Sequence, residues 1–218
     1  MKRTKWNTLK KEAKVEYEDK KSIFIAKARP VQSTQEAMDF LLSVRAEYPD
    51  ANHHVYAWRV SQEMVHQKYS DDGEPSGTAG LPVLEVLSKN EIDDAVVVVT
   101  RYFGGTLLGT GGLVRAYGRS ALLAVKEAVP ITCCVCELYK IMISYSYLDK
   151  VLFALKKKGY IIKSSEYGMD PILQVGCLTG EKDELIHLCT ELTAGQAVVE
   201  FFGEEVLHEG RLGELQVE

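Results

Sequence analysis

The sequence lacks several features that would mark a membrane or secreted protein. No apolar run among its 218 residues approaches the about 18 residues needed to span a membrane. The first residues, MKRTKWNTLKKEAKVEYEDKK, contain no apolar stretch of the kind found in a secretory signal. Cysteine occurs only five times, and an odd number in a chain of this length argues against a disulfide framework. We therefore expect a soluble, cytoplasmic protein without disulfide bonds.

Recognisable metal and nucleotide motifs are missing as well. CCVC, at residues 133–136, has no second close cysteine pair to complete four zinc ligands, and Cys177 and Cys189 stand alone. The sequence has no Walker motif, no nucleophile elbow and no His-x-x-Glu-type metal motif. We expect no metal ion and no cofactor, and we expect the cysteines to serve as small buried apolar residues.

Basic residues are in the minority, with 26 Lys and Arg against 31 Asp and Glu, so the formal net charge is −5. The balance is uneven, because residues 1–29 carry +6 and the remainder carries −11. Overall acidity disfavours non-specific binding to nucleic acid, and no aromatic platform for stacking RNA bases is evident. The basic N-terminal segment still leaves a local basic face as a prediction.

The first 132 residues predict one α+β domain. KSIFIAKARPV alternates apolar and polar residues, as a strand does. Ser33 and Glu36 form a capping-box pair at the start of a helix that Pro49 ends. Four consecutive valines at 96–99 indicate a central strand buried on both faces. The predicted elements are strands over 21–31, 53–60, 63–70 and 94–103 and helices over 33–50, 81–90 and 113–129.

A second domain is predicted over residues 133–218, after a linker at PITCCVCE (130–137). Its pattern is strand, helix, strand, strand, helix, strand, which is the βαββαβ order of a ferredoxin-like domain. Beyond Gly203 the chain is rich in glutamate, and we expect this tail to be partly disordered. The predicted elements are strands over 138–146, 160–168, 171–179 and 197–208 and helices over 147–159 and 181–195.

Two loops contain most of the candidate binding residues. The acidic loop, SDDGEPSGTAG (70–80), holds three carboxylates within four positions: Asp71, Asp72 and Glu74. These carboxylates are candidates for a hard-cation site, a general base or a partner of arginine, although the spacing is not that of an EF-hand. The alternative interpretation is a tight connection, with Asp and Gly chosen for local hydrogen bonds.

The glycine loop, GGTLLGTGG (104–112), runs from the valine-rich strand directly into a helix. Such a loop directs backbone N–H groups at an anion, and the helix dipole adds to the effect. Arg115 and Arg119 lie one helical turn apart and share a face, where they are candidates for a phosphate clamp. In the alternative, the glycines only satisfy turn geometry and close packing. Because one loop is acidic and Arg101, Arg115 and Arg119 are basic, we expect the two loops to form one site.

His53 and His54 begin a predicted strand, so their side chains point to opposite faces and cannot bind one ion from the same side. One of them is expected to face the acidic loop. The candidate binding residues are thus those of the two loops, the arginines and this pair: His53, His54, Asp71, Asp72, Glu74, Thr78, Arg101, Gly104, Gly105, Gly109, Gly112, Arg115 and Arg119. No catalytic residue is assigned.

HHVYAWRV, YSDDGEPSGTAGLPVLEVL, VVVVTRYFGGTLLGTGGLVRAYG and the βαββαβ pattern together resemble the IMPACT family in its bacterial, YigZ-type form. The resemblance covers nearly the whole chain. It implies an N-terminal domain like the second domain of a small-subunit ribosomal protein and a C-terminal domain like the last domain of elongation factor G. Eukaryotic members of the family regulate translation through an initiation-factor kinase and carry an extra RWD domain. We expect no such domain before the first strand near Ser22 and do not transfer the kinase role.

Two functions follow as hypotheses. The first is a non-catalytic, translation-associated binding protein whose partner is the ribosome, RNA or another protein. The second is an enzyme that binds a phosphorylated small molecule or nucleotide, since the implied N-terminal fold is shared with small-molecule kinases. The glycine-rich sequence of those kinases is absent, so we favour the first. We expect a monomer or a weak homo-oligomer with no membrane partner.

Overall fold

The computed structural model describes residues 3–61 and 64–210. It divides into two compact units, one mainly over residues 6–132 and one mainly over residues 133–208. The chain passes from the first to the second within strand β7 (Pro130–Met142). The predicted linker at 130–137 is therefore wrong. Its cysteines and branched residues are mostly buried in this strand, and a segment with such residues gains more from pairing in a sheet than from exposure as a loop.

The first unit is built on a five-stranded sheet in which every pair of neighbours is antiparallel. Strand β6 occupies the centre, between β3 and β4, as the run of valines predicted. The strand order is β2 (Ala13–Asp19), β3 (Ser22–Pro30), β6 (Ala95–Tyr102), β4 (His53–Ser61) and β5 (Val65–Ser70).

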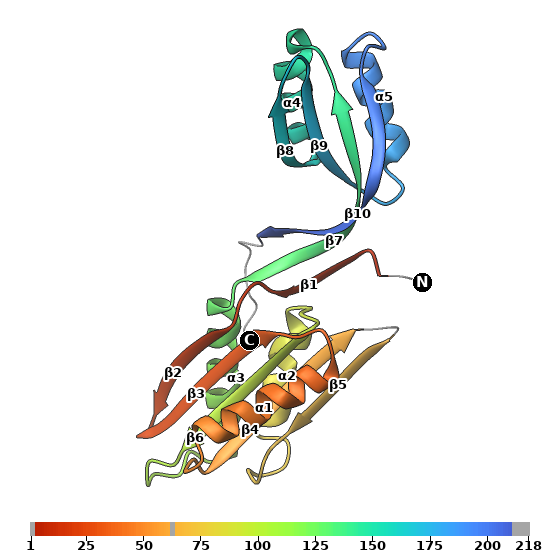
Figure 1. The fold of residues 1–218 in the computed structure, drawn as a ribbon. Coiled ribbons are helices and arrows are strands. Elements are labelled where there is room, and N and C mark those ends of the chain that lie inside the picture. The colour runs from red at the N-terminus through yellow and green to blue at the C-terminus, as the bar shows by residue number, and fades with distance from the viewer. Residues whose placement is uncertain (1–2, 62–63, 211–218) are drawn as a thin grey trace. The chain divides into compact units, whose positions relative to one another are not determined.

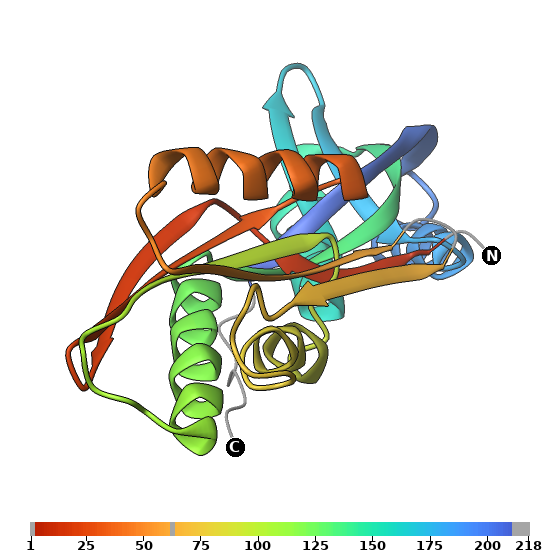
Figure 2. The same cartoon turned by 90° about the horizontal axis from the view of Figure 1, so that it is seen from below.

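Helices cover both faces of this sheet. Helix α1 (Thr34–Glu47) lies on one face, and α2 (Gly80–Lys89) and α3 (Thr110–Glu127) lie on the other (Figure 2). Alternate residues of β6 serve the two sides: Val96 and Val98 pack in the core with α1, and the valines between and after them pack with α2 and α3. The predicted burial of β6 on both faces is confirmed.

The start of α1 shows why this segment is helical where the sequence predicts it. The Ser33 side chain accepts a hydrogen bond from the backbone N–H of Glu36 at 3.1 Å. The Glu36 carboxylate in turn accepts the backbone N–H of Gln32 at 2.8 Å. The first bond satisfies a donor that the first turn of a helix would otherwise leave unpaired, and the second holds the residue before the N-cap against the helix.

Sheet topology brings the two loops to the same edge. Strands β5 and β6 are both antiparallel to β4, so they run parallel to each other and end at the same side of the sheet. The acidic loop leads from the end of β5 into α2, and the glycine loop leads from β6 into α3 (Figure 1). Strands β3 and β4 begin at this edge, because Ile23 pairs with Tyr102 and His53 pairs with Arg101.

The second unit has the predicted order of strands and helices. Its sheet places β7 between β10 and β9, with β8 beyond β9, and the β7–β9 and β8–β9 pairs are antiparallel. Helices α4 and α5 contribute Val151, Leu155, Leu185 and Cys189 to a buried core with the sheet. The elements after β7 are α4 (Tyr145–Lys158), β8 (Ile161–Tyr167), β9 (Pro171–Leu178), α5 (Lys182–Leu192) and β10 (Val198–Gly210).

The sequence missed two strands at the start of the chain and shortened the last one. Strand β1 (Lys5–Leu9) is only five residues long. Strand β2 is rich in charge and alternates exposed and half-buried residues at the edge of its sheet, which conceals its apolar face. The predicted disorder beyond Gly203 is wrong as far as Gly210, because β10 continues through that segment. Gln62, Glu63 and the tail beyond Gly210 lie outside the described residues. Within the described residues, no helix combines the length and the apolar character required to cross a membrane.

Candidate functional site

The acidic loop and the glycine loop meet around a pocket of about 490 Å³. The acidic loop contributes Glu74 and Pro75 to its lining, and the glycine loop contributes Leu107 through Thr110. The remaining lining residues come from the ends of β4 and β6 and from the first turn of α3: Asn52, His53, Arg101, Phe103 and Leu113. The expected meeting of the two loops is thus present, while binding in this pocket stays a prediction.

Asp71 is used to start helix α2. Its carboxylate accepts the backbone N–H groups of Gly77 at 2.8 Å, Ala79 at 3.0 Å and Gly80 at 2.8 Å. The residue at the N-cap position, Ala79, has no side chain that can serve this purpose. A carboxylate at this end of a helix is favoured by the helix dipole as well as by the hydrogen bonds. Asp71 therefore organises the loop from within and has few lone pairs left for a ligand.

Asp72 ties the acidic loop to strand β4 and helix α1. One carboxylate oxygen accepts from the guanidinium of Arg45 at 2.7 Å, and the other accepts the backbone N–H of His54 at 2.6 Å. The residue itself has φ of 46°, a conformation that aspartate tolerates better than most residues. The sequence predicts that Asp72 pairs with Arg101, Arg115 or Arg119. This prediction is wrong. The partner comes instead from the last turn of α1.

Glu74 is the centre of a buried polar group that we call the Glu74 triad: Glu74, Arg101 and Tyr117. One oxygen of Glu74 accepts from the Arg101 guanidinium at 2.6 Å and from the Tyr117 hydroxyl at 2.7 Å. The Glu74 and Arg101 side chains are only 5% and 6% exposed. Arg101 also donates to the Ser22 hydroxyl at 3.2 Å and lies over the rings of Phe24 and Phe103. The predicted pairing of the acidic loop with Arg101 is confirmed.

The two histidines point to opposite sides of β4, as expected. His54 is buried, and its Nε2 lies 3.0 Å from the carbonyl oxygen of Tyr48 at the end of α1. His53 faces the acidic loop, where its Nδ1 lies 2.8 Å from the carbonyl oxygen of Asp72. A carbonyl oxygen only accepts, so Nδ1 carries the proton and the Nε2 of a neutral His53 is unprotonated. This nitrogen lies 3.9 Å from Glu74 in the pocket wall.

Thr78 and the glycines have local structural roles. The buried Thr78 donates its hydroxyl to the carbonyl of Pro75 at 2.6 Å. Gly109 is the N-cap of α3 and has φ of 73°, and Gly105 has φ of 79°, values that an L side chain rarely adopts. A Cβ on Gly112 would lie 2.9 Å from the Cβ of Leu108, so this position keeps the loop packed on the helix. Gly104 is the most constrained of the four, because a Cβ there would lie 2.0 Å from the carbonyl carbon of Lys21.

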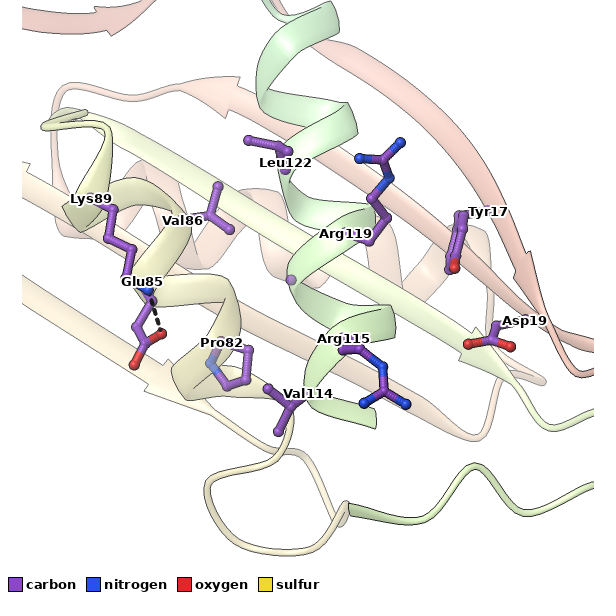
Figure 3. Close-up of a pocket in the computed structure, with 11 residues that line it drawn as sticks. Tyr17, Asp19, Pro82, Glu85, Val86, Lys89, Val114, Arg115, Arg119 and Leu122 are labelled. Carbon is purple, nitrogen blue, oxygen red and sulfur yellow. Dashed lines mark ion pairs between the residues drawn. The ribbon is translucent and has the colours of Figure 1, made fainter. Parts of the chain in front are cut away.

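Arg115 and Arg119 do not belong to the loop pocket. They are exposed on α3 and line a separate groove between α2, α3 and β2 (Figure 3). Helical periodicity explains the separation, since Leu113 and Tyr117 on the same helix face the core. The prediction that all three arginines form one site with the acidic loop is therefore wrong for these two.

The sequence did not predict three side-chain contacts around the loop pocket. Tyr117 sits in an apolar helical stripe, where its hydroxyl gives no separate signal. Arg45 and Ser22 lie 27 and 79 residues from their partners in the site, and no motif connects them. The carboxylates of the acidic loop are occupied by protein donors, and among the described residues no group of three His, Cys, Asp or Glu is arranged to hold a metal ion.

The Glu74 triad predicts how stability changes at alkaline pH. Burial, followed by the hydrogen bond to Glu74, raises the pKa of Tyr117 far above its ordinary value of 10.0. A raised pKa contributes stability that is complete below the unfolded value, near pH 10, and that is lost as the pH rises further. Tyr117→Phe should therefore destabilise the first unit by about 1–3 kcal/mol at pH 8, because Glu74 loses a buried donor.

This difference from the wild type should shrink by about 1.4 kcal/mol per pH unit above pH 10, because the phenylalanine variant has no proton to lose in the unfolded state. Guanidinium denaturation from pH 8 to 11 measures it. Tryptophan fluorescence reports mainly on the first unit, since Trp58 lies in its strand β4 and Trp6 is grouped with the same unit. A difference that stays constant or grows up to pH 11 contradicts the prediction.

Comparison with known proteins identifies both parts of the chain. Residues 20–125 match the model of the Impact N-terminal domain. Residues 141–196 match a domain of unknown function, DUF1949. The first match covers both loops, the Glu74 triad and most of the sheet of the first unit, and the second covers most of the βαββαβ unit.

Similar whole proteins agree with these matches. The IMPACT family member YvyE of Bacillus subtilis is 34% identical over 190 residues, which are 87% of this chain and 88% of that protein. The IMPACT family member YigZ of Escherichia coli is 46% identical over 112 residues, which are 50% of this chain and 55% of that protein. A solved structure described as a hypothetical protein is 33% identical, covers 93% of this chain and 100% of its own, and superposes with a TM-score of 0.58. The chain therefore belongs to the IMPACT family.

Proposed function

We propose that this protein is a non-catalytic binding protein of the cytoplasm that acts in translation, and that the loop pocket receives apolar side chains of a protein partner. The observation that carries the proposal is the contrast between the floor and the rim of this pocket. On the floor, Glu74 and Arg101 neutralise each other and are almost completely buried. On the rim, Phe103 is 46% exposed and Leu107 is 81% exposed.

This contrast supports a protein partner over the other candidates. Exposed aromatic and aliphatic side chains around a recess are typical of the anchor region of a protein interface. Binding of RNA depends on Lys and Arg side chains that have no ion-pair partner and can neutralise phosphates. Among the described residues that line this pocket, Arg101 is the only Lys or Arg, and its charge is already taken by Glu74. The same fact weakens the alternative of a phosphate- or nucleotide-binding enzyme at these loops. The link to translation rests on membership of the IMPACT family.

Co-sedimentation with ribosomes tests the proposal. The wild type should sediment with ribosomes from the organism that encodes it at low salt. It should remain bound at about 0.3 M salt, because salt screens apolar contacts little. Leu107→Asp should weaken binding about tenfold or more, as expected for an interface anchor. The substitution should leave folding unchanged, since the side chain is exposed.

Met169→Asp provides the matched control, because Met169 is 96% exposed and lies in the second unit. It should bind like the wild type. Equal loss for the two variants, or complete loss of wild-type binding at about 0.3 M salt, would contradict apolar docking at the loop pocket. The second outcome would favour an electrostatic contact with RNA instead.

A further inference from the structure

A second recess in the first unit shares no residue with the loop pocket. It is a groove of about 440 Å³ between α2, α3 and β2, with Tyr17 and Asp19 contributed by β2 (Figure 3). Its apolar floor is formed by three residues at four-residue spacing on α3 and by two residues of α2 that face them. These floor residues are Val114, Gly118 and Leu122 from α3, and Pro82 and Val86 from α2.

Gly118 gives this groove its depth. Outside its chain neighbours and the backbone of its own helix, a Cβ built on Gly118 has no heavy atom of the described residues within 4 Å, so no described side chain fills the space above the glycine. The residue lies in the middle of α3, where glycine is less stable than alanine, and its backbone does not require glycine. Neither sterics nor backbone conformation accounts for a glycine here, whereas an open groove does.

The charges along the groove are unbalanced. Three cations and two carboxylates line it, and one of each is used in the pair of Lys89 with Glu85 at 3.6 Å. Arg115 and Arg119 remain beside the single carboxylate of Asp19. Within the described part of the chain, neither arginine has a hydrogen bond or an ion pair. A chain with a net charge of −5 has ample acids to pair them, yet the fold leaves both facing solvent.

In Figure 3 Arg115 and Arg119 both stand on the side of α3 that faces Tyr17 and Asp19, and their guanidinium groups turn apart along the helix. Residues four apart on a helix are neighbours, so these two exposed side chains are within reach of two linked anionic groups of one ligand. The planar fork of arginine matches the oxygens of a phosphate. A groove of this volume is within the usual range for small-molecule sites, and its floor is apolar.

We propose that this groove binds a nucleoside diphosphate, with the base on the floor around Gly118 and the phosphates on Arg115 and Arg119. The apolar floor and the arginine row lie side by side, as the two parts of such a ligand do. The site is independent of the partner surface proposed above, because it uses other residues and another side of α3.

Isothermal titration of the full-length protein with ADP and GDP tests this site. At least one nucleotide should bind with a Kd below 1 mM, and pyrophosphate and the matching nucleoside should each bind at least tenfold more weakly. Arg115→Gln and Arg119→Gln should each weaken nucleotide binding about tenfold, because each removes charged hydrogen bonds. Gly118→Leu should abolish binding with both arginines in place, since its side chain fills the floor.

Lys126→Gln is the matched control, because Lys126 is exposed on α3 but does not line the groove. Lys126→Gln should leave nucleotide binding unchanged. For Gly118→Leu, a melting temperature at or above that of the wild type shows that the variant is folded. Absence of binding by both nucleotides at 1 mM overturns the proposal. The proposal is also overturned if nucleotide binding survives Gly118→Leu, or if pyrophosphate binds as tightly as the nucleotide. It fails as well if a single-stranded RNA oligonucleotide binds through the arginines and neither nucleotide binds.

Discussion

Arg101→Met is expected to lower the free energy of unfolding of the first unit by about 3–5 kcal/mol. The reason lies with Glu74, whose carboxylate is 5% exposed and would keep only the Tyr117 hydroxyl as a donor. A buried charge without its counter-charge costs far more than the net worth of the pair. Methionine has a similar length, so the loss of packing is a smaller part of the effect. Guanidinium denaturation followed by the fluorescence of Trp6 and Trp58 measures it.

A triple variant separates charge from packing. In Arg101→Met/Glu74→Leu/Tyr117→Phe, all three polar members of the Glu74 triad become apolar, so no buried charge is left alone. This variant should lie within about 1 kcal/mol of the wild type, because apolar replacements of a complete buried ionic group are often neutral or stabilising. The Nε of Arg101 is buried without a hydrogen-bond partner among the described residues, which further limits the net worth of the triad. If the triple variant is as unstable as Arg101→Met alone, uncompensated charge is not the cause.

The triad also shows how far the sequence reveals the site. The meeting of the loops was predictable, because each follows a strand and leads into a helix, and because one is acidic and the other is preceded by Arg101. The role of Tyr117 was not, since a tyrosine in an apolar helical stripe looks like any other core residue. Opposite charge alone does not choose among several arginines, and the choice of Arg101 over Arg115 depends on which face of α3 is buried.

Segments between the expected elements were harder to predict than the elements themselves. The sequence predicts CCVC as part of a linker between the two domains, yet these residues lie within strand β7. Strand β2 was missed because its apolar residues alternate with charged residues at a sheet edge. In both cases the pairing partner decides the conformation, and that partner lies elsewhere in the chain.

Gly104→Ala is expected to lower the free energy of unfolding by about 3 kcal/mol, at the upper end of the range for overpacking. A Cβ at this position would lie 2.0 Å from the carbonyl carbon of Lys21 and 2.4 Å from the backbone nitrogen of Ser22. These are backbone atoms of a tight turn in which Lys20 and Lys21 have φ of 46° and 66°, so they cannot move aside as a flexible side chain would. Denaturation monitored by tryptophan fluorescence again measures the change.

The clash should also reach the Glu74 triad, because the Ser22 hydroxyl accepts hydrogen bonds from both Gly104 and Arg101. Gly105→Ala is the matched control one residue away. Its Cβ would have no other heavy atom within 4 Å, so only the φ of 79° opposes it, at a cost of about 1 kcal/mol. If the two alanine variants are equally stable, close approach to the turn at Lys21 does not explain the glycine at 104. A larger loss of unfolding free energy for Gly104→Ala means that Gly104 allows the start of β3 to contact the loop after β6. This contact also positions Arg101, which neutralises Glu74.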